Sequence, residues 1–123
     1  IRSMLAGEQP TIFGDGTQSR DFTFIENVVS ANVLACQAAS AAVSGKVFNI
    51  AAGSSFSLNK VYAELQSLTG FTKPVLYAPT RSGDVRDSLA DTSQAQQAMG
   101  YKTLVGFKEG LRRTMEWYRR EEV

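Results

Sequence analysis

Apolar residues recur every three or four positions in several parts of the chain, which is the spacing that buries one face of a helix. This pattern predicts helices over residues 26–43, 58–69, 92–99 and 107–121. Ser57 is the expected N-cap of the second helix, and Gly70 and Gly100 are expected to end the second and third. In the last helix the expected core residues are Phe107, Leu111, Met115, Trp117 and Tyr118.

Short apolar runs between turn residues predict strands. Residues 11–13 and 22–25 each have this pattern, and residues 75–78 form another short apolar run that ends at Pro79. Residues 47–51, bounded by glycines, are expected to form a strand that is buried on both faces. Because helical and strand patterns alternate, the sequence favours an α/β or α+β fold over an all-α one.

Composition excludes several classes of protein. The chain has 123 residues, 43% of them hydrophobic, which is enough for the core of one domain or of part of a larger one. Its 13 basic and 12 acidic residues are dispersed, so no nucleic-acid or anionic-membrane surface is indicated. No apolar run reaches the length of a bilayer span. The chain starts at Ile1 without a methionine, which suggests a fragment of a longer protein.

The chain has one cysteine and no histidine. Cys36 cannot form an internal disulfide and is expected to be a small buried thiol, which fits a cytoplasmic protein. The absence of histidine excludes His-based metal sites, Ser-His-Asp triads and Cys-His pairs. Any chemistry must therefore use carboxylates, arginines, tyrosines and hydroxyls, or groups from another segment.

Two loops combine glycine with arginine and aspartate. In the first, Gly14-Asp15-Gly16 precedes Arg20, and in the second Arg81-Ser82-Gly83-Asp84 follows the run at 75–78. Each loop alone also fits an ordinary tight turn with a solvated arginine. Two separate guanidinium groups together suit a pyrophosphate, because each phosphate accepts paired hydrogen bonds from the planar fork.

In chain order, residues 10–16, 19–22, 48–51, 81–84 and 111–118 resemble the C-terminal half of NAD-dependent nucleotide-sugar epimerases and dehydratases. These enzymes belong to the extended short-chain dehydrogenase/reductase family. The likeness is greatest to bacterial UDP-N-acetylglucosamine and UDP-glucose 4-epimerases, because of residues 83–86 and 88–91. The resemblance implies an α/β substrate-binding lobe over residues 1–123, with helices and short strands. Residues 47–51 would be a strand at the edge of the Rossmann sheet, and the N-terminal dinucleotide-binding domain would be absent.

The resemblance also implies roles for individual residues. The backbone around Thr11 and Phe13 would meet uracil, Arg20 and Arg81 would hold the diphosphate, and Asp84 would bind ribose hydroxyls. These roles agree with the residue types, because an arginine followed three residues later by a carboxylate can bind a phosphate and the adjoining sugar.

Two further residues complete the expected substrate site. Arg86 would either add to the positive field at the phosphates or pair with Asp84 or Asp87. Ser88 matches a position where the resembling epimerases have either a small or a bulky aromatic residue. A small residue there goes with N-acetylated sugars, since the acetamido group needs room when the hexose rotates.

The resemblance places catalysis outside this chain. In the complete enzyme, NAD oxidises C4 of the hexose, the keto sugar rotates, and the hydride returns to the other face. Here Gly14-Asp15-Gly16 lacks the spacing of a dinucleotide-binding fingerprint, and no Tyr-x-x-x-Lys occurs. We therefore expect no cofactor-binding or catalytic residue and no metal site in this chain, which would be inactive alone.

The expected partners are a UDP-sugar and either the dinucleotide-binding half or a second copy of the chain. Two other functions stay open: a non-catalytic nucleotide-sugar-binding or assembly module, and the matching lobe of a dehydratase or decarboxylase. Because the strand expected at 47–51 would lack its neighbour in the isolated chain, we expect that chain to self-associate.

Overall fold

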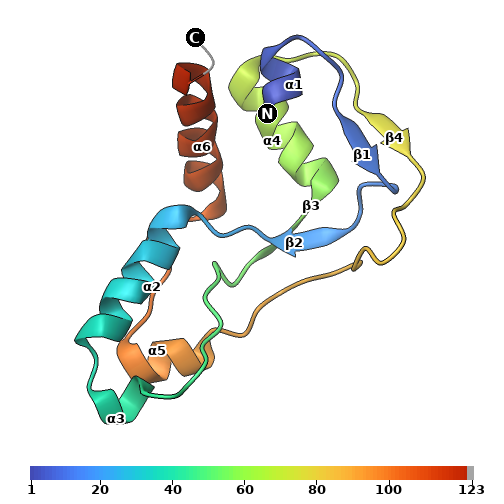
Figure 1. Ribbon diagram of the computed structural model, residues 1–123. Coiled ribbons are helices and arrows are strands. Elements are labelled where there is room, and N and C mark those ends of the chain that lie inside the picture. Colours follow the sequence, from blue (N-terminus) through green and yellow to red (C-terminus); the bar gives the residue numbers. More distant parts are fainter. Residues whose placement is uncertain (122–123) are drawn as a thin grey trace. The chain divides into compact units, whose positions relative to one another are not determined.

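The computed structural model describes residues 1–121 (Figure 1). The chain divides into two compact units. The first unit consists of residues 1–20, 55–88 and 111–121, and the second of residues 21–54 and 89–110. Helices and short strands are mixed as the sequence predicts, and one pair of strands is parallel.

Short strands organise the first unit. β1 (Thr11–Phe13) pairs in parallel with β4 (Leu76–Ala78), so the prediction of a strand at 11–13 is confirmed. β2 (Ser19–Asp21) pairs with β3 (Ser55–Ser57). The strand predicted at 22–25 is wrong, because hydrogen-bonding partners lie beside the preceding residues instead. The Ser19 amide donates to the Arg86 carbonyl at 2.8 Å, and the Ser19 carbonyl accepts from the Ser88 amide at 3.2 Å.

Helices supply the core of the first unit. α1 (Arg2–Leu5), α4 (Leu58–Thr69) and α6 (Phe107–Glu121) each contribute one buried side chain, which are Met4, Leu65 and Met115. The ends predicted for α4 are confirmed. The Ser57 hydroxyl accepts from the Lys60 amide at 3.2 Å, and Gly70 is left-handed with φ 72°. Arg119 of α6 donates to the Leu68 carbonyl of α4 at 3.1 Å.

Helices also form the second unit, which contains α2 (Ile25–Gln37), α3 (Ser40–Val43) and α5 (Ser93–Met99). The helix predicted over 26–43 is therefore two helices. Ala38 and Ala39 between them are extended, with ψ 154° and 131°. Alanine is the best helix former, so propensity does not explain the break. The break lets α3 pack against α5, and this tertiary contact overrides the local preference.

The second unit has a small core of Ala31, Ala95 and Tyr101, against which Leu34, Phe48, Ile50 and Met99 pack. Asn27 of α2 is fully buried beside it. Its Nδ2 donates to the Val105 carbonyl at 2.8 Å, and its Oδ1 accepts from the amides of Leu104 and Val105 at 2.8 and 3.0 Å. These three bonds fix residues 104–105 to α2. Gly100 ends α5 as predicted, with φ 70°.

Residues 47–51 do not form the predicted strand. Val47 is 88% exposed while Phe48 and Ile50 pack on the core, so the segment is not buried on both faces. Within residues 1–121, residues 47–50 form no backbone hydrogen bond. An extended segment becomes a strand only where a neighbour pairs with it, and the described part of the chain places none there.

Two predicted core residues are exposed. Cys36 follows the buried Ala31 by five residues, which is about 140° around α2. Trp117, 48% exposed, follows the buried Met115 by two residues, about 200° around α6. In α6 only Met115 of the predicted core set is fully buried, while Phe107, Leu111 and Tyr118 are half-buried.

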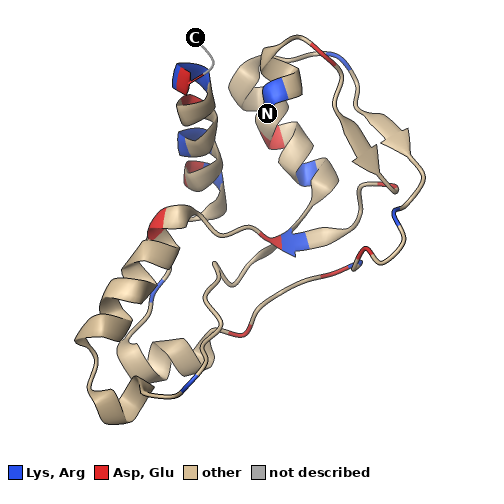
Figure 2. Ribbon diagram, viewed as in Figure 1, with Lys and Arg blue, Asp and Glu red and all other residues tan. Residues whose placement is uncertain are grey.

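Along α6, positively and negatively charged residues alternate (Figure 2). Residues of both signs also lie next to each other in β2. Among residues 1–121, no helix combines the length and the apolar character that crossing a membrane requires.

Candidate functional site

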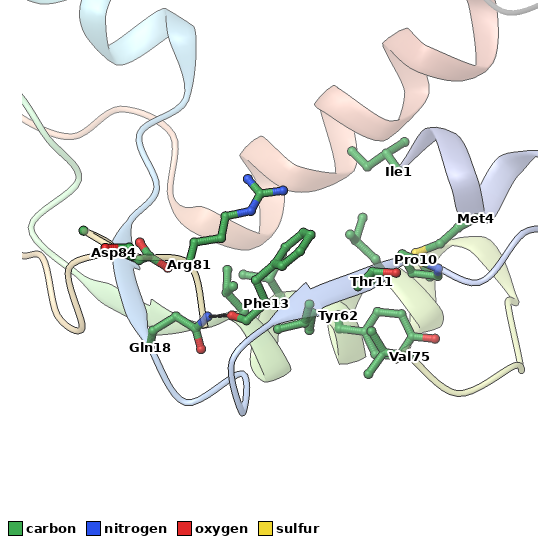
Figure 3. Close-up of a pocket in the computed structure, with 16 residues that line it drawn as sticks. Ile1, Met4, Pro10, Thr11, Phe13, Gln18, Tyr62, Val75, Arg81 and Asp84 are labelled. Carbon is green, nitrogen blue, oxygen red and sulfur yellow. Dashed lines mark hydrogen bonds between the residues drawn. The ribbon is translucent and has the colours of Figure 1, made fainter. Parts of the chain in front are cut away.

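A cavity of about 560 Å³ opens in the first unit (Figure 3). Its apolar wall comes from α1, β1 and α4, through residues such as Met4, Ile12 and Val61. Its polar end comes from residues 81–84. Small-molecule sites in proteins enclose roughly 300–1,000 Å³ and combine apolar walls with a few polar groups. The cavity therefore has the size and the lining of a ligand site.

The glycine-containing loop beside the cavity is fixed to the start of α4. Gly16 has φ 77°, and its carbonyl accepts a hydrogen bond from the backbone N–H of Asn59 at 2.9 Å. Asn59 Nδ2 donates to the Asp15 carbonyl at 3.1 Å, and its Oδ1 accepts from the Tyr77 hydroxyl at 2.9 Å. A Cβ on Gly16 would overlap the side-chain amide group of Asn59. Only glycine combines this backbone conformation with this close approach.

Asp15 stabilises the turn that follows. Its carboxylate accepts from the hydroxyl of Thr17 at 2.6 Å and from the amide of Thr17 at 2.9 Å. These hydrogen bonds lower the pKa of Asp15 below its ordinary value, and the bond from the Thr17 hydroxyl has the larger effect. The positive charge of Arg86 lowers the pKa further by a smaller amount. Asp15 therefore remains ionised at neutral pH and keeps the turn closed.

Gln18 is buried between this loop and β1, with 8% of its surface exposed. Its Nε2 donates to the Phe13 carbonyl (Figure 3). Its Oε1 is buried and has no hydrogen-bond partner among the described residues. Because the Phe13 carbonyl can only accept, the amide orientation is set, and Oε1 remains an available acceptor.

Two contacts join the arginines to other site residues. The Arg81 guanidinium lies over the Phe13 ring, with its Cζ 3.7 Å from the ring centroid. Arg20 Nη2 pairs with Asp84 Oδ1 at 2.5 Å, and Arg20 Nη1 donates to the carbonyls of Ser19 and Arg86 at 2.7 and 3.2 Å. Two guanidinium groups and one carboxylate thus gather at the polar end of the site.

The structure places the predicted site residues as follows. Thr11, Phe13, Arg81 and Asp84 line the cavity, and Arg20 reaches it through Asp84. Arg86 lines a second cavity of about 230 Å³ instead, on the side of Asp15 and Thr17.

Arg20, Arg86 and Ser88 are the predicted residues that do not line the cavity. The side chain of Arg86 forms no ion pair with Asp84 or Asp87 within residues 1–121, while the Asp87 carboxylate accepts from the Ser19 hydroxyl at 2.7 Å. Ser88 is exposed and contacts β2 through its amide. Its expected role near the sugar stays a prediction.

Three residues of the site were missed from the sequence. Gln18 lies between the glycine loop and Arg20, and its position next to them is a signal that could have found it. Asn59 bonds to the loop backbone and Tyr77 bonds to the side chain of Asn59, and no motif marks either residue.

The Gly14–Gly16 turn can be compared with a dinucleotide-binding turn. Dinucleotide-binding turns connect a strand to a helix, whose N-terminus meets the pyrophosphate. Here the Gly14–Gly16 turn connects β1 to β2, with no helix after it. The Gly14–Gly16 turn thus differs in its connection from a dinucleotide-binding turn.

The chain is similar to known proteins over nearly its whole length. The model of the NAD dependent epimerase/dehydratase family matches residues 1–51. A UDP-glucose 4-epimerase of Mycolicibacterium smegmatis is 32% identical over 117 residues, which are 95% of this chain and 36% of that protein. Other relatives are a UDP-glucuronate 4-epimerase, a UDP-N-acetylglucosamine 4-epimerase and a UDP-N-acetyl-alpha-D-glucosaminuronate decarboxylase.

Solved structures show the same likeness. The UDP-glucose 4-epimerase of Thermotoga maritima, determined with UDP-glucose, matches 98% of this chain and 38% of its own with a TM-score of 0.91 and 37% identity. MoeE5 in complex with UDP-glucose and NAD matches 99% of this chain and 40% of its own, with a TM-score of 0.86 and 41% identity.

The chain thus spans little more than a third of the length of the relatives that it matches. The fold, the motif order and these likenesses agree with one another: over nearly its whole length the chain resembles the corresponding part of NAD-dependent nucleotide-sugar epimerases and dehydratases, as the sequence predicts.

Proposed function

We propose that this chain is the UDP-sugar-binding part of an NAD-dependent UDP-glucose or UDP-N-acetylglucosamine 4-epimerase. The observation that carries the proposal is the 560 Å³ cavity, whose polar end presents Arg81 and Asp84 with Arg20 beside them. The apolar wall suits a nucleobase, the two guanidinium groups suit a diphosphate, and the carboxylate suits ribose hydroxyls.

The chemical step belongs to the complete protein. There NAD would accept a hydride from the hexose and return it, and the dinucleotide-binding domain would hold it. Residues 1–121 would bind and orient the nucleotide so that the hexose reaches that domain. We propose that the 123-residue chain alone is inactive, because it contains no Tyr-x-x-x-Lys and no dinucleotide-binding fingerprint.

The decarboxylase among the relatives supports a second candidate, the matching lobe of a nucleotide-sugar decarboxylase. The two candidates share the nucleotide site and differ in the product. Incubating the complete protein with UDP-glucose, UDP-N-acetylglucosamine and UDP-glucuronic acid, with product analysis by NMR, separates them. Interconversion at C4 supports the epimerase, and release of carbon dioxide from the acid supports the decarboxylase.

Calorimetric titration with UDP tests the nucleotide site itself. Loss of one charge-assisted hydrogen bond costs about 1.5–3 kcal/mol, so we expect the Arg20→Ala and Arg81→Ala variants to bind UDP about ten- to a hundredfold more weakly. The double variant should bring binding below detection. Arg120→Ala removes an exposed arginine at the end of α6 and is the matched control. Unchanged UDP affinity in the double variant would contradict the diphosphate assignment.

A further inference from the structure

Arg81 occupies space that a stacked base would use. Its guanidinium carbon is 3.7 Å from the centroid of the Phe13 ring, which is the separation of two stacked planar groups. Arg81 and Phe13 both line the cavity, so this stack takes up part of it (Figure 3). A nucleobase that stacks on the same face of Phe13 must displace the Arg81 side chain.

The Asp84 carboxylate is bonded to an N–H of Arg20 that a bound phosphate would use. Arg20 Nη1 is bound to the carbonyls of Ser19 and Arg86, so this side of the guanidinium is anchored in the backbone. Nη2 is bound to the Asp84 carboxylate. A phosphate oxygen that takes the Nη2 N–H now bonded to Asp84 must replace the carboxylate oxygen. The released carboxylate then needs new donors, which ribose hydroxyls can provide.

The two contacts are made by residues of one turn. The Asp84 amide donates to the Arg81 carbonyl at 3.2 Å, and Gly83 between them has φ 82°. This turn is exposed and lies between β4 and the bridge from Asp87 to Ser19. A backbone movement of this turn would displace both side chains, whereas rotation of the Arg81 side chain alone would break only its contact with Phe13.

We propose that Arg81 and Asp84 are internal competitors of the ligand, and that they make the site specific for molecules that carry a base and a diphosphate together. A nucleoside alone breaks the Arg81–Phe13 stack and leaves Arg81 without a new partner. Pyrophosphate alone takes Arg20 from Asp84 and leaves the carboxylate unpaired beside added negative charge. A nucleoside diphosphate replaces both contacts, because its phosphates receive the arginines and its ribose receives Asp84. The inference rests on the proposed function of the same cavity.

The test is calorimetric titration of the complete protein with uridine, inorganic pyrophosphate and UDP. For an exposed cation–π contact, its removal corresponds to about a two- to fivefold change in affinity. In Arg81→Ala we therefore expect uridine to bind about two- to fivefold more tightly and UDP at least tenfold more weakly. In Asp84→Asn we expect pyrophosphate to bind several-fold more tightly and uridine more weakly. Arg81→Gln keeps a long polar side chain without charge and should behave like Arg81→Ala.

Changes of opposite sign for the ligand fragments are the expected result, since a simple contact residue lowers the affinity of every ligand that it touches. The proposal is overturned if Arg81→Ala binds uridine no better than the wild type, or if Asp84→Asn binds pyrophosphate no better. If the wild type binds UDP normally in that case, only the internal competition is wrong. If no form of the protein binds UDP, the proposed function fails as well.

Discussion

Replacing Gly16 with alanine tests whether the glycine loop positions the nucleotide site. Gly16 has φ 77°, and a non-glycine residue in this left-handed region costs about 1–2 kcal/mol. The new Cβ would also overlap the Asn59 amide, which must rotate away and lose its bonds to the Asp15 carbonyl and the Tyr77 hydroxyl. At about 0.5–1.5 kcal/mol for each hydrogen bond, the added cost is about 1–3 kcal/mol.

Gly7 is a matched control. Its φ is 73°, and a Cβ there would meet no atom within 4 Å. Gly7→Ala therefore carries the backbone cost alone, whereas Gly16→Ala carries it with the loss of the Asn59 bonds. In urea unfolding of the complete protein, we expect Gly16→Ala to lower the free energy of unfolding by about 1–3 kcal/mol more than Gly7→Ala.

Binding separates the two variants further. The loop joins Phe13 to Gln18 and Arg20, so its distortion should weaken UDP binding in Gly16→Ala and leave it unchanged in Gly7→Ala. A double-mutant cycle adds a direct test, because Gly16→Ala should cost less in an Asn59→Ala background. Equal destabilisation by the two glycine variants, or an unchanged cost in that background, would refute the assignment of Asn59 as the residue that holds the loop.

Four other outcomes are expected. Asn27→Ala should lower the free energy of unfolding by about 3 kcal/mol in urea titration, because two buried backbone groups of Val105 and the half-buried amide of Leu104 lose their partner, while Asn32→Ala on the exposed side of the same helix should change it little. In the complete enzyme Ser88→Tyr should abolish turnover of UDP-N-acetylglucosamine and keep that of UDP-glucose, and equal loss of both would contradict the role of Ser88. The isolated 123 residues, given NAD and UDP-sugars, should show no interconversion, and measurable product would count against the fragment hypothesis. That isolated chain should also self-associate through the unpaired backbone of residues 47–50, which light scattering would detect as a mass above that of the monomer. Val47→Lys should reduce the association. A monomeric mass of the unchanged chain at micromolar concentration would show the hypothesis to be wrong.

The sequence predicted elements well where local chemistry marks both ends. Ser57 and Gly70 delimit α4, and Gly100 ends α5, because a hydroxyl N-cap and a left-handed glycine act within one helical turn. Prediction failed where a distant segment decides the outcome. Ser19 is in a strand because β3 pairs with β2 and residues 86–88 lie beside Ser19, and nothing in residues 19–25 indicates these neighbours.

The same distinction explains the errors in the second unit. Ala38 interrupts a run of good helix formers so that α3 can contact α5, and this contact is invisible in the local pattern. Residues 47–51 have the composition of a buried strand, but backbone pairing with a neighbour defines a strand, and within residues 1–121 no backbone–backbone hydrogen bond is made by residues 47–50.

For the site, residue types could be predicted and their contacts could not. The glycine and arginine loops marked Arg20, Arg81 and Asp84, whereas the contact of Arg81 with Phe13 joins residues 68 positions apart. The parallel pairing of β1 with β4 brings them together, because it sets Phe13 opposite Ala78, three residues before Arg81. Successive side chains of a strand point to opposite faces, so a shift of one residue in β1 would turn Phe13 to the other face of the pair. The register of two three-residue strands thus decides whether the arginine meets the aromatic ring, and short apolar runs specify register only weakly.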